Sequence, residues 1–86
     1  MNTNTLIVNK IRELYPDIAY HRIHTTATHL RDQSCWMIRF KKDKYVLNTV
    51  LENSDAALLL SGQQCMSLTV EIQQISDSLK VLELKP

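Results

Sequence analysis

The chain has 86 residues with a formal net charge of +1, a hydrophobic content of 44%, one glycine and two prolines. This length suits one domain, and the scarcity of glycine and proline excludes a low-complexity or linker-like chain. The longest apolar run, residues 56–60, falls far short of the roughly 20 residues that a membrane-spanning helix needs. We therefore expect one compact domain over residues 1–86 that does not enter a membrane.

The N-terminus and the cysteine content bear on the compartment of the protein. Residues 1–5 have neither the basic nor the apolar segment of a signal peptide. Two cysteines, Cys35 and Cys65, do not make the dense disulfide framework of small secreted domains. These features predict a cytoplasmic protein.

The first predicted element is an amphipathic helix. Threonine and asparagine side chains at the start of the chain are good N-caps, and Ile7, Ile11 and Leu14 follow at the spacing of one helix face. Pro16 disfavours helical dihedral angles at the residue before it, so the helix should end there. We predict this helix over residues 4–15.

Three segments rich in β-branched and aromatic residues follow, and they predict an antiparallel meander. The predicted strands are residues 18–28, 35–41 and 45–51. The second strand is the clearest, because Trp36, Ile38 and Phe40 alternate with the cationic residues Arg39 and Lys41. A polar break at residues 31–34 and a tight turn at Lys42 and Asp43 separate the three strands.

The polar residues 53–55 are a helix-start signal, residues 56–60 favour a helix, and Gly62 suits the position that ends one.

The segment after Gly62 fits two patterns. Alternating apolar and polar residues over 66–73 match a strand. A seam with alternating gaps of three and four matches a helix and consists of Cys65, Leu68, Ile72, Ile75, Leu79 and Leu82.

Length favours a helix over residues 67–83, while the β-branched residues Thr69, Val70 and Ile72 favour a strand, so both interpretations stay open. The fold class expected is α+β: an N-terminal helix, a three-stranded antiparallel meander and a C-terminal helical region. The candidate self-association seam consists of Leu68, Ile72, Ile75, Leu79 and Leu82. In the helical interpretation, Met66, Val70, Val81 and Leu84 remain outside this seam, which gives the segment more apolar surface than one thin sheet covers. The excess predicts a protein partner, most simply a second copy in a homodimer.

Positive charge is concentrated in the first half of the chain. Residues 1–44 hold eight Lys and Arg against four Asp and Glu, a balance of +4, while residues 45–86 hold two against five, a balance of −3. The candidate nucleic-acid surface consists of Arg22, Arg39, Lys41, Lys42 and Lys44. Four such cations on duplex DNA would give a log–log salt slope of about −3.6. A solvated sheet edge is the alternative explanation.

Three histidines and one cysteine lie within residues 21–35, and the second cysteine lies far along the chain, which raises the question of a metal or thiol site. The residues concerned are His21, His24, His29, Cys35 and Cys65. Zinc sites use these side chains, but their spacing contains no Cys-x2-Cys or His-x3-His pair. Cys35 begins a strand on the face opposite Trp36, which would leave its thiol exposed. No nucleophile, acid–base or phosphate-loop motif is present, so we assign no catalytic, cofactor or metal residues and expect no enzyme.

The order helix, three-stranded meander, helix is similar to that of double-stranded RNA-binding domains. Those domains carry a lysine-rich start to the last helix, whereas the corresponding place here reads Glu52-Asn53-Ser54-Asp55. The resemblance is therefore one of element order, and no family follows from it. The function expected first is a small regulatory or adaptor protein with a protein–protein surface. A nucleic-acid-binding module and a Cys/His metal-binding or thiol-dependent protein are the alternatives.

Overall fold

A computed structural model describes residues 3–84, with side chains described through residue 79. Its elements, in chain order, are α1 (Thr3–Leu14), α2 (Pro16–Tyr20), β1 (His24–Leu30), η1 (Arg31–Gln33), β2 (Cys35–Lys42), β3 (Tyr45–Glu52), α3 (Asn53–Leu60) and α4 (Met66–Leu84). The strands form an antiparallel sheet in the order β1–β2–β3. The predicted α+β class and meander are confirmed.

The N-terminal region contains two helices where one was predicted. α1 matches the predicted helix, and its Ile7 and Ile11 are fully buried. Pro16 ends α1 and also starts α2, because its fixed φ and missing N–H suit the first turn of a helix. The predicted strand over residues 18–28 is therefore wrong at its start, since residues 18–20 are helical and β1 begins at His24.

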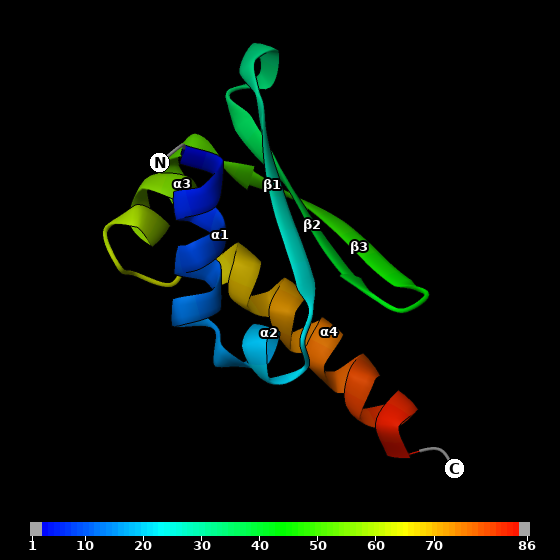
Figure 1. Cartoon of the computed structure of the whole chain (residues 1–86). Helices are drawn as coiled ribbons and strands as arrows, with labels where there is room; N and C mark the ends of the chain where they lie inside the picture. Colours follow the sequence, from blue (N-terminus) through cyan, green and yellow to red (C-terminus); the bar gives the residue numbers. More distant parts are fainter. Residues whose placement is uncertain (1–2, 85–86) are drawn as a thin grey trace.

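The sheet has one covered and one open face. Trp36, Ile38 and Phe40 of β2 are buried in the core, while Arg39 and Lys41, on the other face, are exposed. α1 packs on β1, and α3 and α4 contact β3. Figure 1 shows the helices gathered on one side of the sheet. The alternation in β2 was therefore predicted correctly, and the open face remains to be explained.

α3 ends as its sequence predicts. Gly62 has a φ of 92°, in the region that favours glycine. Its N–H donates to the carbonyl of Leu59, and the N–H of Gln63 donates to the carbonyl of Leu58, both at 2.9 Å. These two bonds form a Schellman motif, which satisfies carbonyls left free at the helix end.

The last segment is the helix α4, so the strand interpretation of residues 66–73 is wrong. Four seam residues, Leu68, Ile72, Ile75 and Leu79, are buried within this one chain, and Cys65 just before the helix is buried with them. The last seam residue, Leu82, lies outside the described side chains. Burial of the seam gives this sequence a reason to be helical, because a strand would place only alternate residues in the core. Within residues 3–84, no helix is long and apolar enough to cross a membrane.

Candidate functional site

The open face of the sheet is polar and basic at one end. The strand register places His24, Lys41 and Val46 side by side on it, across all three strands. The next row contains Thr26, Arg39 and Asn48, which are all exposed. The described helices lie on the other face, so these side chains meet solvent.

Beside the first row, the surface forms an open hollow of about 510 Å³. Its lining combines three cations and a histidine with one carboxylate: Arg22, Lys41 and Lys42, then His24, then Asp43. β1 and β2 bring His24 and Lys41 together as directly opposed residues, and the β2–β3 turn contributes Asp43. Three of the five residues of the predicted nucleic-acid surface thus meet around this hollow.

The backbone holds two of the lining residues in unusual conformations. Arg22, in the link between α2 and β1, has a φ of 56°, and Asp43 has a φ of 53°. Both are non-glycine residues in the left-handed region, which is sparsely populated outside glycine. The Lys42 ammonium donates to the backbone carbonyl of His21, so β2 is tied to this link. The backbone conformation and this hydrogen bond therefore hold the residues that line the hollow in place.

A second hollow of about 370 Å³ adjoins the first and shares Arg22 and His24 with it. Arg12, from the last turn of α1, lines it as well. The two hollows together bring four cations of the N-terminal half to one surface. The sequence analysis missed Arg12, because nothing in the helix pattern indicates that its end lies beside β1.

The other two predicted residues lie near the hollows without lining them. Arg39 is exposed on the open face, two residues before Lys41 on the same strand. Lys44 is exposed in the turn between β2 and β3. Both extend the positive surface along the sheet. Among the described residues that line either hollow, Asp43 is the only carboxylate.

An exposed aromatic ring lies two residues before Arg22 in the chain. Tyr20, at the end of α2, is 79% exposed, although tyrosine is usually at least half-buried in a folded domain. Its ring contacts that of the buried His21 edge to face, with a centroid distance of 5.0 Å. Tyr20 is followed two residues later by Arg22. An exposed aromatic ring is a surface on which a nucleic-acid base stacks.

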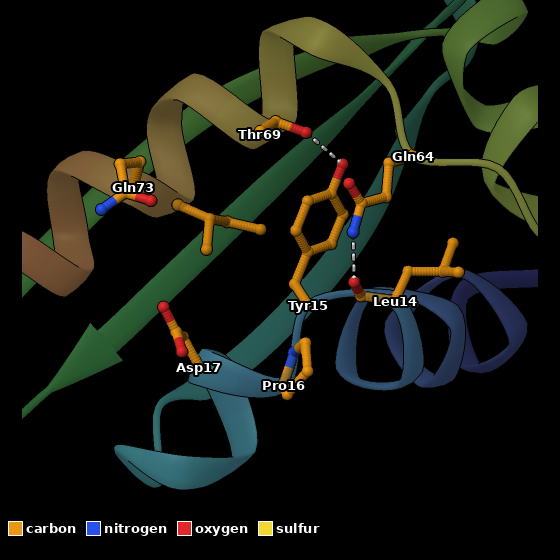
Figure 2. Close-up of a pocket in the computed structure, with 8 residues that line it drawn as sticks. Leu14, Tyr15, Pro16, Asp17, Gln64, Thr69 and Gln73 are labelled. Atoms are coloured by element: carbon orange, nitrogen blue, oxygen red, sulfur yellow. Dashed lines mark hydrogen bonds between the residues drawn. The ribbon is translucent and has the colours of Figure 1, made fainter.

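A third hollow, of about 240 Å³, lies between α1, α2 and the start of α4 (Figure 2). The Tyr15 hydroxyl points to the N-terminus of α4, where it lies 2.8 Å from the Thr69 hydroxyl. It also accepts the Cys65 N–H at 3.1 Å. Thr69 in turn donates to the Cys65 carbonyl at 2.9 Å.

The remaining polar groups around this third hollow are also paired. Gln64 donates its amide N–H to the Leu14 carbonyl at 2.6 Å, and Ser76 donates to the Asp17 carboxylate at 2.8 Å. Burial raises the pKa of the Tyr15 phenol above its ordinary value of 10.0, so the hydroxyl is neutral at physiological pH. These groups fasten α4 to the first two helices, which gives the hollow a structural role.

The histidines and cysteines are dispersed. His21 and Cys65 are buried, His24 is exposed at the basic hollow, and His29 lies at the other end of β1 with its ring 4.5 Å from that of Trp36. No group of three His, Cys, Asp or Glu side chains suited to a metal ion occurs among the described residues.

The expectation that Cys35 is exposed is wrong. The residue is only 5% exposed although it lies on the open face, and its thiol contacts the side-chain carbonyl of Gln33 in the turn before β2, at 3.9 Å. A reactive thiol needs both solvent access and a cationic neighbour. The thiol-dependent alternative thereby loses its most accessible cysteine.

The chain was compared with family models, curated proteins and solved structures, and nothing matches it. The similarity to double-stranded RNA-binding domains thus stays at the level of element order. The last helix of the structure is α4, and its start, Met66-Ser67-Leu68, also lacks the lysines of that family.

Proposed function

We propose that this protein is a non-catalytic module that binds a single-stranded nucleic acid across the basic end of its sheet. The observation that carries the proposal is the cluster of Arg12, Arg22, Lys41 and Lys42 around two adjoining hollows lined by one carboxylate. Guanidinium groups hold phosphate oxygens through two parallel hydrogen bonds, and ammonium groups add point charges. The cluster is therefore suited to consecutive phosphates of a backbone.

The shape of the surface favours a single strand over a duplex. The cations lie within open hollows at the sheet edge, where a flexible backbone bends to follow them. Tyr20, two residues before Arg22 in the chain, offers its exposed ring to one unstacked base. Arg39, Thr26 and Asn48 continue the path across the open face with donors and acceptors for sugar and phosphate.

A regulatory or adaptor role through a protein partner is the second candidate. The described seam residues are buried within the chain, so this role has to use other apolar residues. Met66 and Val70 of α4, which lie outside the seam, are 83% and 50% exposed. Val46 and Val50 on the open face of β3 are 42% and 50% exposed, and they are the observation that favours it. Both roles are compatible in one molecule, because neither valine of β3 lines the basic hollows.

The test is fluorescence anisotropy over a salt series, with labelled single-stranded oligonucleotides of about twelve nucleotides, a length within the range of site sizes of known single-strand-binding folds. Four phosphate contacts on a single strand give a slope of log affinity against log salt of about −2.8. Lys41→Glu is expected to weaken binding and to bring the slope toward zero by at least about 0.7. Lys10→Glu is the matched control, since Lys10 lies on α1 beside Glu13 and lines neither hollow.

Tyr20→Ala separates stacking from charge, because it is expected to weaken single-strand binding by about 1–3 kcal/mol while the salt slope stays unchanged. Duplex oligonucleotides and polyglutamate complete the series. Equal affinity for polyglutamate and the oligonucleotides would show a surface that responds to charge of any kind, and the proposal would fail. It would also fail if Lys41→Glu and Lys10→Glu weakened binding equally.

A further inference from the structure

β3 is an edge strand, and no strand of residues 3–84 pairs with its outer side. The sheet order is β1–β2–β3, so β3 pairs with β2 alone. In Figure 1, β3 forms the side of the sheet that lies away from α1. Half of the backbone N–H and C=O groups of an edge strand point away from the sheet, and they readily pair with another strand.

Both faces of β3 are also incompletely covered. On the core face, Tyr45, Leu47 and Thr49 are only half-buried, whereas the residues that oppose the last two on β2, Phe40 and Ile38, are completely buried. On the open face, Val46 and Val50 are 42% and 50% exposed. Edge strands are usually protected by lysine, proline or a bulge, and β3 has no lysine or proline within its eight residues.

The sequence of β3 is self-complementary in one antiparallel register. We propose that β3 pairs with β3 of a second copy of this chain around a two-fold axis at Asn48. This register places Val46 opposite Val50 of the second copy, and Val50 opposite its Val46. Asn48 faces its own symmetry mate, so two apolar pairs flank a pair of amides that hydrogen bond to each other.

Charge at the two ends of the strand agrees with the same register. Lys44 immediately precedes β3 and Glu52 ends it, and both are exposed. With Asn48 on the axis, Lys44 lies opposite Glu52 of the second copy, and the symmetry repeats this pair at the other end. Within the described side chains, neither residue makes an ion pair in its own chain.

Neighbouring registers lose these matches. Opposed residues of an antiparallel pair share a face, so the register changes by shifting the axis one residue along β3. Moving the axis to Leu47 places Val46 opposite Asn48 and Lys44 opposite Val50. Moving it to Thr49 places Val46 opposite Glu52. Only the axis at Asn48 pairs valine with valine and lysine with glutamate.

The pairing joins the two sheets into one, with both open faces on the same side. Arg39 and Lys41 of both copies then line one extended surface, and the basic hollows lie toward its two far ends. Pairing is an inference of its own, independent of nucleic-acid binding, because it is carried by β3 and measured without any ligand. An interface made by one strand is small, so the dimer is expected to form with rising protein concentration.

Cysteine cross-linking tests the position of the axis. Antiparallel partners have Cα atoms about 4.5–5.5 Å apart, within the range that a disulfide bridges. Asn48→Cys is therefore expected to form a covalent dimer under mild oxidation. Thr26→Cys is the matched control, since Thr26 is in the same row of the sheet but on β1. The native thiols of Cys35 and Cys65 are buried and contribute little background.

A charge exchange tests the register. Sedimentation equilibrium is expected to show weaker association for Lys44→Glu and for Glu52→Lys, because each places like charges opposite one another. The double variant K44E/E52K restores opposite charges and is expected to regain the association of the unchanged chain. Circular dichroism is the control for folding, and it is expected to show the same spectrum for the variants as for the unchanged chain, because both residues are exposed.

Three results would overturn the proposal. The first is a sedimenting mass of one chain at every concentration. The second is cross-linking of Thr26→Cys as fast as that of Asn48→Cys. The third is association that the double variant K44E/E52K does not recover. Absence of oligonucleotide binding by the unchanged chain, with association intact, would reject the proposed function and leave this pairing standing.

Discussion

The Tyr15 hydroxyl joins parts of the chain that are 50 residues apart in sequence. It accepts the N–H of Cys65 and lies in hydrogen-bond distance of Thr69, and the residue as a whole is only 5% exposed. A consistent arrangement is a closed cycle, in which Cys65 donates to Tyr15, Tyr15 to Thr69, and Thr69 back to the Cys65 carbonyl. Such cycles strengthen each bond and make the loss of any member costly.

Tyr15→Phe removes the hydroxyl and keeps the ring. The Cys65 N–H is then buried without its acceptor, which costs about 1–3 kcal/mol. We expect urea denaturation to show a free energy of unfolding lower by that amount. Tyr20→Phe is the control and is expected to leave the free energy of unfolding unchanged, because Tyr20 is exposed and its hydroxyl makes no hydrogen bond among the described residues.

The raised pKa of Tyr15 gives the same residue a signature in alkaline solution. Above pH 10 the phenol of the unfolded chain loses its proton while that of the folded chain keeps it. This ionisation lowers the free energy of the unfolded state only, so the free energy of unfolding falls. The contribution of Tyr15 to stability is therefore complete below pH 10 and is lost as the pH rises through the folded pKa. Tyr15→Phe is expected to show a smaller alkaline loss of stability than the unchanged chain, and an equal loss would contradict this.

Tyr15 also shows why single residues escape sequence analysis. The helix pattern of Ile7 and Ile11 was readable because both positions belong to one element with a fixed period. The hydrogen-bond partners of Tyr15 are distant in the sequence. The same is true of β1, which lies beside Arg12 in the last turn of α1. Contacts of this kind follow from the arrangement of elements, which no local pattern contains.

At the scale of elements, the sequence identified those whose signals are local and failed where two signals compete. The alternation in β2 and the polar start and glycine stop of α3 were read correctly. Pro16 was read only as the end of one helix, although a proline equally suits the first turn of the next. The secondary structure of α4 could not be predicted uniquely, because its β-branched residues favour a strand. Burial of the seam residues against the core favours the helix that is observed.

Gly62 provides the prediction at this scale. A Cβ at this position would have no heavy atom within 4 Å, so a substitution meets no steric clash with neighbours and its cost is that of the backbone conformation alone. Gly62→Ala is expected to lower the free energy of unfolding by about 1 kcal/mol, and Gly62→Asn by less, because asparagine tolerates positive φ. Thermal denaturation measures both. Equal stability of all three proteins would show that the Schellman motif contributes little.

At the scale of the whole molecule, the uneven charge of the sequence becomes a spatial polarity. Eight of the ten Lys and Arg residues lie in the first 44 positions. Four of them, Arg12, Arg22, Lys41 and Lys42, meet around the two hollows. The sequence predicted the basic hairpin but not its convergence with α1 and the link after α2, which depends on the packing of α1 against β1.

The buried seam residues of α4 are expected to contribute strongly to the free energy of unfolding of this small chain. We expect Ile75→Ala to lower the free energy of unfolding by about 2–5 kcal/mol, since Ile75 is 1% exposed and the substitution leaves a cavity. Val70→Ala, on the exposed face of the same helix, is the control and is expected to change it by no more than about 0.5 kcal/mol.

The dependence on protein concentration separates a core from an interface. If the seam is internal, the loss caused by Ile75→Ala is the same in dilute and concentrated samples, because the contacts lie within one chain. If the seam were a dimer interface, the loss would disappear in samples dilute enough to be monomeric, since the contact would be absent from both proteins there. Urea denaturation of both variants across a wide concentration series distinguishes these outcomes. A constant loss excludes the seam as a dimer interface, whereas a loss that vanishes on dilution would make the seam of α4 the surface through which two copies meet.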